Sequence, residues 1–287
     1  MTAELKQKTV VVSTIEEIKK ITEAFRGGTL GLVPTMGYLH NGHINLIKQS
    51  LKKCDHTVVS IFINPRQFSS GEDLDIYPSN LAGDIEKLES IGVDVLFYPN
   101  RDTIYPEGFK TNIQVDEITQ HLCGKSRPEL FKGVATIVLK LFNIVRPQHA
   151  FFGEKDWQQL AVIETMTRDL NIDVKIHRAP LIREPDGLAM SSRNSNLSPG
   201  ERKKALSLSR SLNDSKEKVK KGITSSKQLR QNIKSIITAE SGTQIDYISI
   251  CDPISLEEKE EVKGRTLIAL AVKIGPARLI DNCIIGD

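Results

Sequence analysis

The sequence predicts an α/β protein in which a Rossmann-like parallel sheet with flanking helices is followed by a smaller C-terminal α+β domain. Up to about Arg183, short apolar runs alternate with amphipathic segments, as is typical of right-handed βαβ units in a parallel sheet. Beyond Arg183 the chain becomes polar and rich in turn residues, and it closes with three apolar or alternating runs. Because 287 residues suffice for two cores, we expect domains at 1–183 and 184–287.

The strands of the first domain are expected where apolar runs stop at a turn residue or a proline. These runs are 29–33, 57–64, 93–99, 150–152 and 172–177. Helices are expected where apolar residues recur at i, i+3 and i+7, as Ile44, Ile47 and Leu51 do. The expected helices are 42–54, 84–91, 133–145 and one that begins after the letters GEKD. The helix at 133–145 is apolar nearly all round, which predicts burial.

The second domain is expected to pair two helices with three strands. Ser198, Pro199 and Glu201 form the capping-box pattern of a helix start. A second helix carries four apolar residues on one face, namely Leu229, Ile233, Ile236 and Ile237. The closing strands are expected at 245–250, 266–274 and 277–285.

Composition narrows the class of protein. The net charge of +3 is spread over 39 basic and 36 acidic residues, which gives little support for nucleic-acid binding. Neither a signal peptide nor a membrane span is visible in the sequence, so we expect a cytoplasmic protein without membrane association. The four cysteines lie far apart without CxxC spacing, which fits reduced, buried thiols.

The stretch PTMGYLHNGH, residues 34–43, joins the first expected strand to the first expected helix. Ligands of open parallel sheets bind at this edge, and helix N-terminal amides favour an anion there. Gly37 permits backbone angles closed to other residues, and Gly42 lets backbone approach a ligand. His40 and His43 can point at one place. They can cap a turn, bind zinc or face a phosphate, although zinc lacks a nearby third ligand.

A second strand-to-helix joint carries the letters FGEKDWQQL, residues 152–160. Lys155 would place an ammonium where the helix dipole also favours phosphate. Asp156 can cap the helix, and Gln159, one turn on, offers both a donor and an acceptor. An ordinary charged helix start explains the same residues equally well.

Two further stretches carry polar groups suited to a ligand. MSSRN, residues 190–194, places two hydroxyls before Arg193, which suits a phosphate-gripping loop but also a plain serine-rich linker. FINPRQF, residues 62–68, ends the second strand with Asn64 and Gln67, which suit a small polar substrate or a solvated strand end. The motifs GxGxxG, GxxxxGK[ST] and GxSxG are missing, so dehydrogenases, P-loop enzymes and α/β-hydrolases lose support.

Seven motifs follow one another from about Val33 to Asn282: PTMGYLHNGH, VSIFINPRQF, EDLDIYP, SRPELFKGVATIVLKLFNIV, FGEKDWQQL, DGLAMSSRN and ARLIDN. In this order they resemble the pantothenate synthetase (pantoate-β-alanine ligase) family. The first motif looks like the HxGH signature of the wider nucleotidyltransferase superfamily. That signature alone is weak, whereas seven ordered matches are specific.

The resemblance implies an ATP-dependent ligase of pantothenate and coenzyme A biosynthesis. It would condense (R)-pantoate with β-alanine and release AMP and pyrophosphate through an enzyme-bound pantoyl adenylate. The catalytic residues implied are His40, His43, Lys155 and Arg193, with His43 as the proton donor. The resemblance also implies a homodimer whose small domain, 184–287, closes over the site as a lid.

The resemblance also implies which residues bind each substrate. Gln67 and Gln159 would hold pantoate, with Gln67 also near β-alanine. Asp84, beside Gly83, is a candidate contact for Mg²⁺, the usual companion of ATP phosphates. The residues implied for ATP are Met36, Gly37, His40, Gly42, His43, Gly153, Glu154, Lys155, Asp156, Ile182, Met190, Ser191, Ser192 and Arg193.

Two other functions stay open at this point. A nucleotidylyltransferase of the HxGH superfamily would release pyrophosphate but no AMP. A non-catalytic nucleotide-binding regulator would bind ATP without trapping an adenylate.

Overall fold

The chain divides into two compact units, each of which collects several stretches of the sequence. The computed structural model describes residues 8–68 and 74–286, so Glu72 and Asp73 of the EDLDIYP motif lie outside the described residues. The first unit comprises the residues up to Val115, Glu129–Glu154 and Val162–Pro180, and the second comprises Asp116–Pro128, Lys155–Ala161 and Leu181–Asp287. The domain division at 183 and the lid role of 184–287 stay predictions.

The described residues of the first unit form a six-stranded parallel sheet in the order β1-β4-β3-β2-β5-β6, which confirms the predicted fold class. The strands are β1 (Val10–Val12), β2 (Leu30–Thr35), β3 (His56–Ile61), β4 (Val95–Phe97), β5 (His149–Gly153) and β6 (Lys175–Ala179). From β2 the chain adds β3 and β4 on one side and later β5 and β6 on the other. The topological switch point, where ligands of open α/β sheets bind, therefore lies between β2 and β5.

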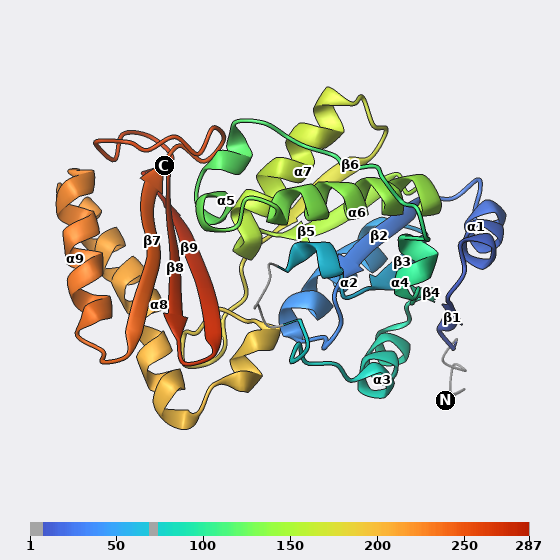
Figure 1. Ribbon diagram of the computed structural model, residues 1–287, viewed down its shortest axis with the longest axis horizontal. Coiled ribbons are helices and arrows are strands. Elements are labelled where there is room, and N and C mark those ends of the chain that lie inside the picture. The colour runs from blue at the N-terminus through green and yellow to red at the C-terminus, as the bar shows by residue number, and fades with distance from the viewer. Residues whose placement is uncertain (1–7, 69–73, 287) are drawn as a thin grey trace. The chain divides into compact units, whose positions relative to one another are not determined.

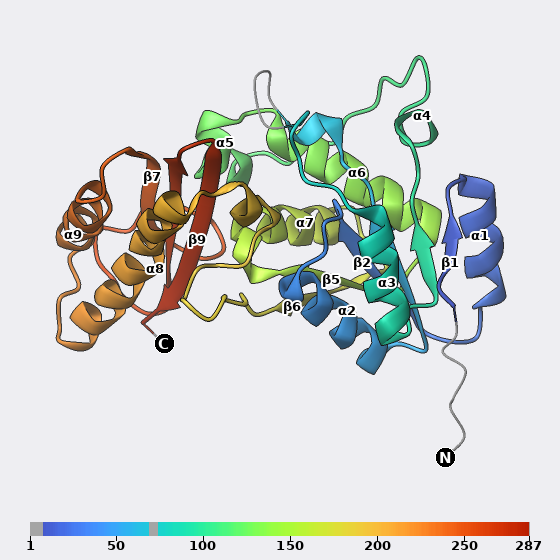
Figure 2. The same cartoon turned by 90° about the horizontal axis from the view of Figure 1, so that it is seen from below.

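Helices cover both faces of this sheet (Figures 1 and 2). The buried helix α6 covers one face and contacts β2, while α2 and α3 cover the other. Burial of α6 follows from its nearly continuous apolar surface, as predicted. The helices that lie wholly in this unit are α1 (Ile15–Ala24), α2 (Asn41–Lys53), α3 (Leu81–Ile91), α4 (Arg101–Ile104) and α6 (Leu130–Val145). Helix α7 (Trp157–Asp169) begins in the second unit and ends in the first.

Strand β1 and helix α1 were not among the predicted elements. The strand has only three residues, too few for a period to be read. Helix α1 did carry a signal, because Thr14 and Glu17 have capping-box spacing. In the structure Thr14 accepts the backbone N–H of Glu17, whose carboxylate accepts that of Thr14 at 3.0 Å.

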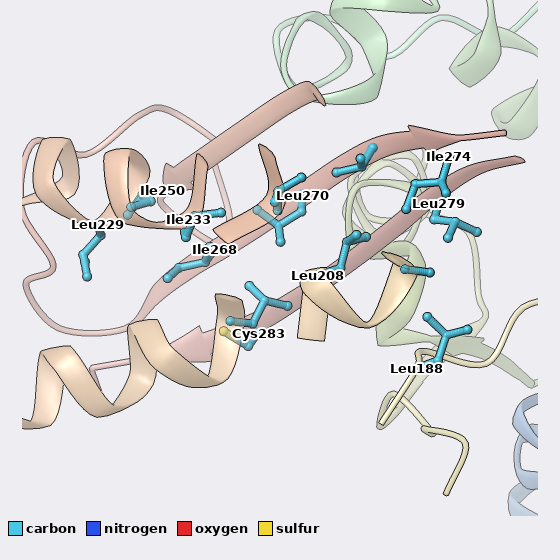
Figure 3. Packing of buried hydrophobic residues seen from close by; sticks show 14 of the residues in the cluster. Leu188, Leu208, Leu229, Ile233, Ile250, Ile268, Leu270, Ile274, Leu279 and Cys283 are labelled. Carbon is cyan, nitrogen blue, oxygen red and sulfur yellow. The ribbon is translucent and has the colours of Figure 1, made fainter. Parts of the chain in front are cut away.

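In the second unit an antiparallel sheet in the order β7-β8-β9 packs against two helices. The elements are α5 (Cys123–Ser126), α8 (Pro199–Lys220), α9 (Ser226–Thr238), β7 (Thr243–Cys251), β8 (Thr266–Ile274) and β9 (Ala277–Ile285). Figure 3 shows the core between helices and sheet, where Leu208 and Ile233 meet Ile268 and Leu270. The predicted capping box at Ser198 is present: its hydroxyl accepts the N–H of Glu201, whose carboxylate accepts the backbone N–H of Ser198.

The cysteines Cys54, Cys123, Cys251 and Cys283 are all free and buried, as predicted. Among residues 8–68 and 74–286, no helix is both long enough and apolar enough to cross a membrane.

Candidate active site

The turn between β2 and α2 has a backbone conformation that favours glycine at position 37. Gly37 and Tyr38 have φ of 84° and 51°, both in the left-handed region. A Cβ at Gly37 would lie 3.0 Å from Ile61 Cγ2, so the position is also crowded. The N–H of Gly37 donates to the hydroxyl of Thr35 at 3.2 Å. Half-buried Met36 thus connects β2 to a turn whose backbone conformation is fixed by these contacts.

Two side chains of α3, Asp84 and Lys87, hold this turn, and we call them the α3 clasp. Asp84 is 1% exposed, and its carboxylate accepts the backbone N–H groups of Tyr38 and Leu39, each at 2.7 Å. Lys87 donates to the Leu39 carbonyl at 2.7 Å and lies 3.8 Å from the Asp84 carboxylate. A buried carboxylate needs such partners because unpaired charge is costly to desolvate. The backbone just before His40 is therefore held by both its N–H and its carbonyl groups.

His40 and His43 form a stacked pair at the N-terminus of α2. Their ring centroids are 3.9 Å apart and their planes are inclined by 21°. His40 Nδ1 accepts the N–H of Gly42 at 3.1 Å, and His43 Nδ1 accepts the N–H of His40 at 3.4 Å. Because Nδ1 accepts in both rings, each neutral ring carries its proton on Nε2. Each imidazole can therefore donate a hydrogen bond without being charged.

Gln67 lies on η1 (Pro65–Gln67), a short 3-10 turn that follows β3 and is held by the buried side chain of Asn64. The side-chain oxygen Oδ1 of Asn64 accepts the Arg66 N–H at 3.3 Å and the Tyr105 hydroxyl at 2.9 Å. Its amide donates to the carbonyl of Gly133 at 3.1 Å. A Cβ at Gly133 would lie 2.2 Å from the Arg66 carbonyl oxygen, so α6 packs directly on this turn. Gln67 is thus presented by a fixed backbone.

Strand β5 ends at Gly153, where neither packing nor backbone angle calls for glycine. Its φ is not in the left-handed region, and a Cβ there would meet no described atom within 4 Å. A glycine with open space beside it lets another molecule approach the backbone closely. Because β2 lies between β3 and β5, the histidine turn, Gln67 and Gly153 with Glu154 follow three neighbouring strand ends on one edge of the sheet.

Lys155 and Asp156 belong to the second unit, on η3 (Glu154–Asp156) just before α7. The Lys155 side chain is 20% exposed, and its ammonium lies 3.6 Å from the Asp156 carboxylate. Gln159, one turn into α7, is half-buried. Its neighbour Gln158 is buried, with its carbonyl oxygen accepting the Cys123 N–H at 2.9 Å. These contacts fix the first turn of α7 within the second unit.

The segment that carries Arg193 is also folded closely, and the remaining predicted nucleotide contacts lie on it. The N–H of Met190 donates to the Ile182 carbonyl at 3.0 Å. Ser191 begins η4 (Ser192–Asn196) by accepting the Arg193 N–H on its hydroxyl at 3.3 Å. Asn194 is buried, and its amide donates to the Ala189 carbonyl at 3.0 Å. The serine-rich letters therefore form an ordered turn rather than an extended linker.

Sequence reasoning missed the residues that hold these turns, among them Lys87, Gln158 and Asn194. Gln158 and Asn194 lie inside recognised motifs and Lys87 lies three residues after the candidate Asp84, but nothing in the letters shows which polar side chains meet the main chain of a distant turn. Their partners also lie far along the chain: Gln158 donates to the carbonyls of Ile118 and His121 at 2.9 and 2.7 Å. No local pattern marks these residues, because their immediate neighbours include polar or charged residues such as Glu86, Gln159 and Arg193.

The fold and the histidine turn define a class of protein: α/β proteins with a helix N-terminus at the switch point of a parallel sheet, where anionic ligands commonly bind. The model of the Pantoate-beta-alanine ligase family matches residues 10–284. A pantothenate synthetase of Acetivibrio thermocellus is 52% identical over 277 residues, which cover 96% of this chain and 99% of that protein. The chain therefore belongs to the pantoate-β-alanine ligase family, and it is an enzyme that joins pantoate to β-alanine.

Solved structures agree with this assignment. A pantothenate synthetase from Thermus thermophilus superposes with a TM-score of 0.93 at 40% identity, covering 97% of this chain and all of that one. A pantoate-β-alanine ligase from Francisella tularensis, complexed with beta-gamma ATP and β-alanine, has a TM-score of 0.82 at 37% identity. It covers 96% of this chain and 97% of its own.

Proposed function

We propose that the protein uses ATP to condense (R)-pantoate with β-alanine, releasing AMP and pyrophosphate by way of an enzyme-bound pantoyl adenylate. Family membership supports the overall reaction, and the Francisella relative was solved with beta-gamma ATP and β-alanine. The observation that carries the use of ATP is the histidine turn. It places two imidazole rings, each of which can donate a hydrogen bond from Nε2, at a helix N-terminus whose first turn has no acidic residue.

The chemistry requires two transfers. A pantoate carboxylate oxygen attacks the α-phosphorus of ATP, and the bond from that phosphorus to the pyrophosphate oxygen breaks. The amine of β-alanine then attacks the acyl carbon, the bond from that carbon to the AMP oxygen breaks, and the amine loses a proton. Adenylation is needed because a free carboxylate is unreactive toward amines. In both steps negative charge builds up on oxygens, which hydrogen-bond donors and cations stabilise.

The proposed roles follow the chemistry of each side chain. His40 and His43 donate hydrogen bonds to the ATP phosphates. His43 donates to the pyrophosphate group that leaves during adenylation. Lys155 and Arg193 bring positive charge to the adenylation transition state, with the Ser191 and Ser192 hydroxyls beside Arg193. The neutral donor and acceptor groups of Gln67 and Gln159 suit the hydroxyls and carboxylate of pantoate, and Gln67 also serves β-alanine. The remaining nucleotide contacts proposed are Met36, Gly37, Gly42, Gly153, Glu154, Asp156, Ile182 and Met190.

The described residues do not fit a metal ion held by the protein itself. Across the part of the chain that the structure describes, no group of three or more His, Cys, Asp or Glu side chains could hold one. Asp84, the predicted Mg²⁺ contact, already accepts a backbone N–H on each carboxylate oxygen. We therefore propose that Mg²⁺ arrives with ATP, whose phosphates and waters supply most of its ligands. The direct contact between Asp84 and Mg²⁺ that the sequence suggested is the alternative, and the Mg²⁺ dependence of an Asp84→Asn variant distinguishes the two.

We also propose a cytoplasmic homodimer. The proposal rests on the family resemblance and on the biosynthetic reaction, whose substrates are small polar molecules. Light scattering of the purified protein would give twice the mass of 32.0 kDa for a dimer. A mass of one chain at micromolar concentration would contradict it.

The decisive experiment measures AMP and pyrophosphate in parallel. Purified protein with ATP and Mg²⁺ should release AMP at turnover only when pantoate and β-alanine are both present. With β-alanine omitted, labelled pantoate should be retained on the enzyme as the adenylate. Pyrophosphate without AMP in the complete mixture would instead identify a nucleotidylyltransferase. ATP binding without any trapped adenylate would identify a regulator.

A further inference from the structure

The last motif, ARLIDN at residues 277–282, has no chemistry assigned to it, yet it places two buried polar residues side by side on β9. Asp281 is 2% exposed and Asn282 8% exposed. Strand alternation puts Asp281 on the face of Leu279 and Cys283, which belong to the apolar core of the second unit, and puts Asn282 on the opposite face. A carboxylate within an apolar face is costly unless it is paired. The two residues therefore need partners in two directions.

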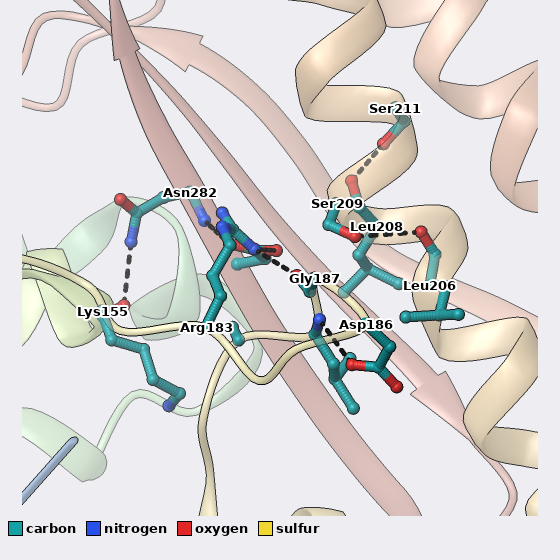
Figure 4. Close-up of polar contacts among 12 residues, drawn as sticks. Lys155, Arg183, Asp186, Gly187, Leu206, Leu208, Ser209, Ser211 and Asn282 are labelled. Atoms are coloured by element: carbon teal, nitrogen blue, oxygen red, sulfur yellow. Dashed lines mark hydrogen bonds and ion pairs between the residues drawn. The ribbon is translucent and has the colours of Figure 1, made fainter. Parts of the chain in front are cut away.

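Asp281 forms an ion pair with Arg183 (Figure 4). The guanidinium donates two hydrogen bonds to the carboxylate, at 2.7 and 2.9 Å, and a third to the Gly187 carbonyl at 3.1 Å. Burial disfavours the charged guanidinium, but the hydrogen bonds and charge of Asp281 outweigh it and raise the pKa of Arg183. Arg183 also pairs with Ala189 in an isolated antiparallel bridge. The pair with Asp281 thus fixes the base of the turn that leads into Met190 and η4.

Asn282 holds the other group of interest, because its side-chain amide donates to the main-chain carbonyl of Lys155 at 2.9 Å. The backbone N–H of Asn282 in turn donates to the Asp281 carboxylate at 2.8 Å. Figure 4 shows the Asn282 amide directed at the Lys155 carbonyl, with the lysine side chain leading away from it. One strand thus holds both the backbone of Lys155 and the segment that carries Arg193, all within the second unit.

We infer that Asp281 and Asn282 are positioning residues for the ligation reaction: together they keep Lys155 and the 190–194 segment in one fixed arrangement. This inference rests on the proposed role of Lys155. Neither residue is assigned contact with substrate. A purely stabilising role explains the arrangement less well, since buried ion pairs can often be replaced by apolar residues without loss of stability. Small displacements of a reacting group, by contrast, reduce rates strongly.

The test is a double-mutant cycle between Asn282→Ala and Lys155→Ala. Single-turnover adenylate formation is measured with enzyme in excess, so that slow rates remain measurable. Alone, Asn282→Ala should slow adenylate formation about tenfold or more, with less change in the ATP dissociation constant. In the Lys155→Ala background the same substitution should change the rate less than about twofold, because the group that it positions is gone.

A matched control separates positioning from stability. Asn232→Ala also removes a half-buried amide in the second unit, one that donates to Asp214 on the neighbouring helix. It should lower the melting temperature without slowing adenylate formation. If Asn282→Ala does not fold, Asn282→Ser, which keeps a short donor, enters the same cycle.

Each outcome decides one question. Equal slowing by Asn282→Ala with and without Lys155 overturns the inference, as does a variant that loses only melting temperature. If wild-type protein forms no adenylate, or if Lys155→Ala is fully active, the proposed function or the role of Lys155 has failed instead. A loss confined to the lysine-containing background supports the inference.

Discussion

The two units of the chain hold the backbone beside the proposed site residues in comparable ways, but with partners at different distances along the sequence. In the first unit the α3 clasp holds the turn before His40 across sequence separations of 45 to 48 residues. In the second unit β9 holds Lys155 and Arg183 across separations of 127 and 98 residues. In both, a buried polar group of one element fixes the main chain beside a side chain with a proposed role in the reaction.

The difference lies in what each holder contacts. In the α3 clasp, a carboxylate and an ammonium on one helix bind main-chain N–H and carbonyl groups. On β9, the Asp281 carboxylate binds a guanidinium and the Asn282 amide binds a main-chain carbonyl. We expect the α3 clasp to be more sensitive to substitution than the contacts of β9. No other side chain can replace a buried carboxylate that accepts two backbone N–H groups. The comparison therefore predicts a ranked series of effects.

The largest effect is expected when a proposed reactive group itself is removed. Lys155→Ala should lower kcat by about 10²-fold or more, because an ammonium that stabilises the adenylation transition state contributes to rate more than to ground-state binding. Steady-state kinetics with AMP detection would measure it. Lys220→Ala, which removes an exposed lysine of α8, is the matched control. A rise in the KM for ATP with unchanged kcat would reassign Lys155 to ground-state binding.

The next effect concerns the α3 clasp. Asp84→Asn keeps the shape of the side chain but sets an amide N–H₂ against one of two backbone donors. We expect kcat to fall about 10- to 10²-fold and the free energy of unfolding to fall by about 1–3 kcal/mol. The Mg²⁺ concentration for half-maximal rate should not change. Glu86→Gln on the same helix is the control. An increased Mg²⁺ requirement, rescued by added Mg²⁺, would instead show that Asp84 contacts the metal.

A smaller effect is expected at the second residue of the clasp. Lys87→Met should lower kcat only about two- to fivefold. The Lys87 side chain is half-exposed, so a water molecule can replace its ammonium as the donor to the Leu39 carbonyl. Steady-state kinetics with AMP detection would measure this change as well. Lys87→Arg, which keeps a cationic donor, should lie closer to wild type. Should Lys87→Met be as damaging as Asp84→Asn, the clasp depends on both charges equally.

The smallest effect on activity is expected away from both turns. His149 Nδ1 lies 2.9 Å from His177 Nε2 in the first unit. Burial, His149 and the charges of Lys53 and Lys175 lower the pKa of His177 to about 4. The unfolded chain, with a histidine pKa of about 6.5, then binds more protons than the folded one. The contribution of His177 to the free energy of unfolding should therefore be fully present above about pH 6.5 and should be lost as pH drops toward 4.

Urea unfolding from about pH 4 to 7 checks this prediction. His177→Gln should flatten the pH dependence over that interval, by on the order of 1 kcal/mol after allowance for solvent screening, and should leave kcat near neutral pH unchanged. His121→Gln, which alters a histidine outside the pair, is the control. An unaltered slope in His177→Gln would contradict the pKa shift.

Most of the fold is predictable from the sequence because period and turn residues mark the elements locally. The expected runs at 266–274 and 277–285 coincide with β8 and β9. The strand expected at 172–177 lies instead at Lys175–Ala179, because the apolar letters at its start belong to the turn that leaves α7. Strand β1 was missed because three residues at a sheet edge show no period.

The chemistry of the site is predictable only where motif letters carry it. His40, Lys155 and Arg193 were predicted as site residues because their types and spacing suit phosphate, and their roles stay predictions. The contacts of Asp281 with Arg183 and of Asn282 with the Lys155 carbonyl were not predicted, because they join residues about a hundred positions apart. Sequence periodicity reports which face a residue occupies, but not which main-chain group it meets across the fold.

The interleaved make-up of the second unit has a consequence for synthesis on the ribosome. Its stretches 116–128 and 155–161 emerge well before their sheet: Cys123 contacts the Tyr247 hydroxyl at 3.4 Å, 124 residues later in the chain. Trp157 likewise donates to the Pro253 carbonyl, 96 residues later. At translation speeds of about 5–20 residues per second, these stretches wait several seconds for their partners. The second unit therefore closes last, and a chain released early would leave Lys155 without the strand that holds it.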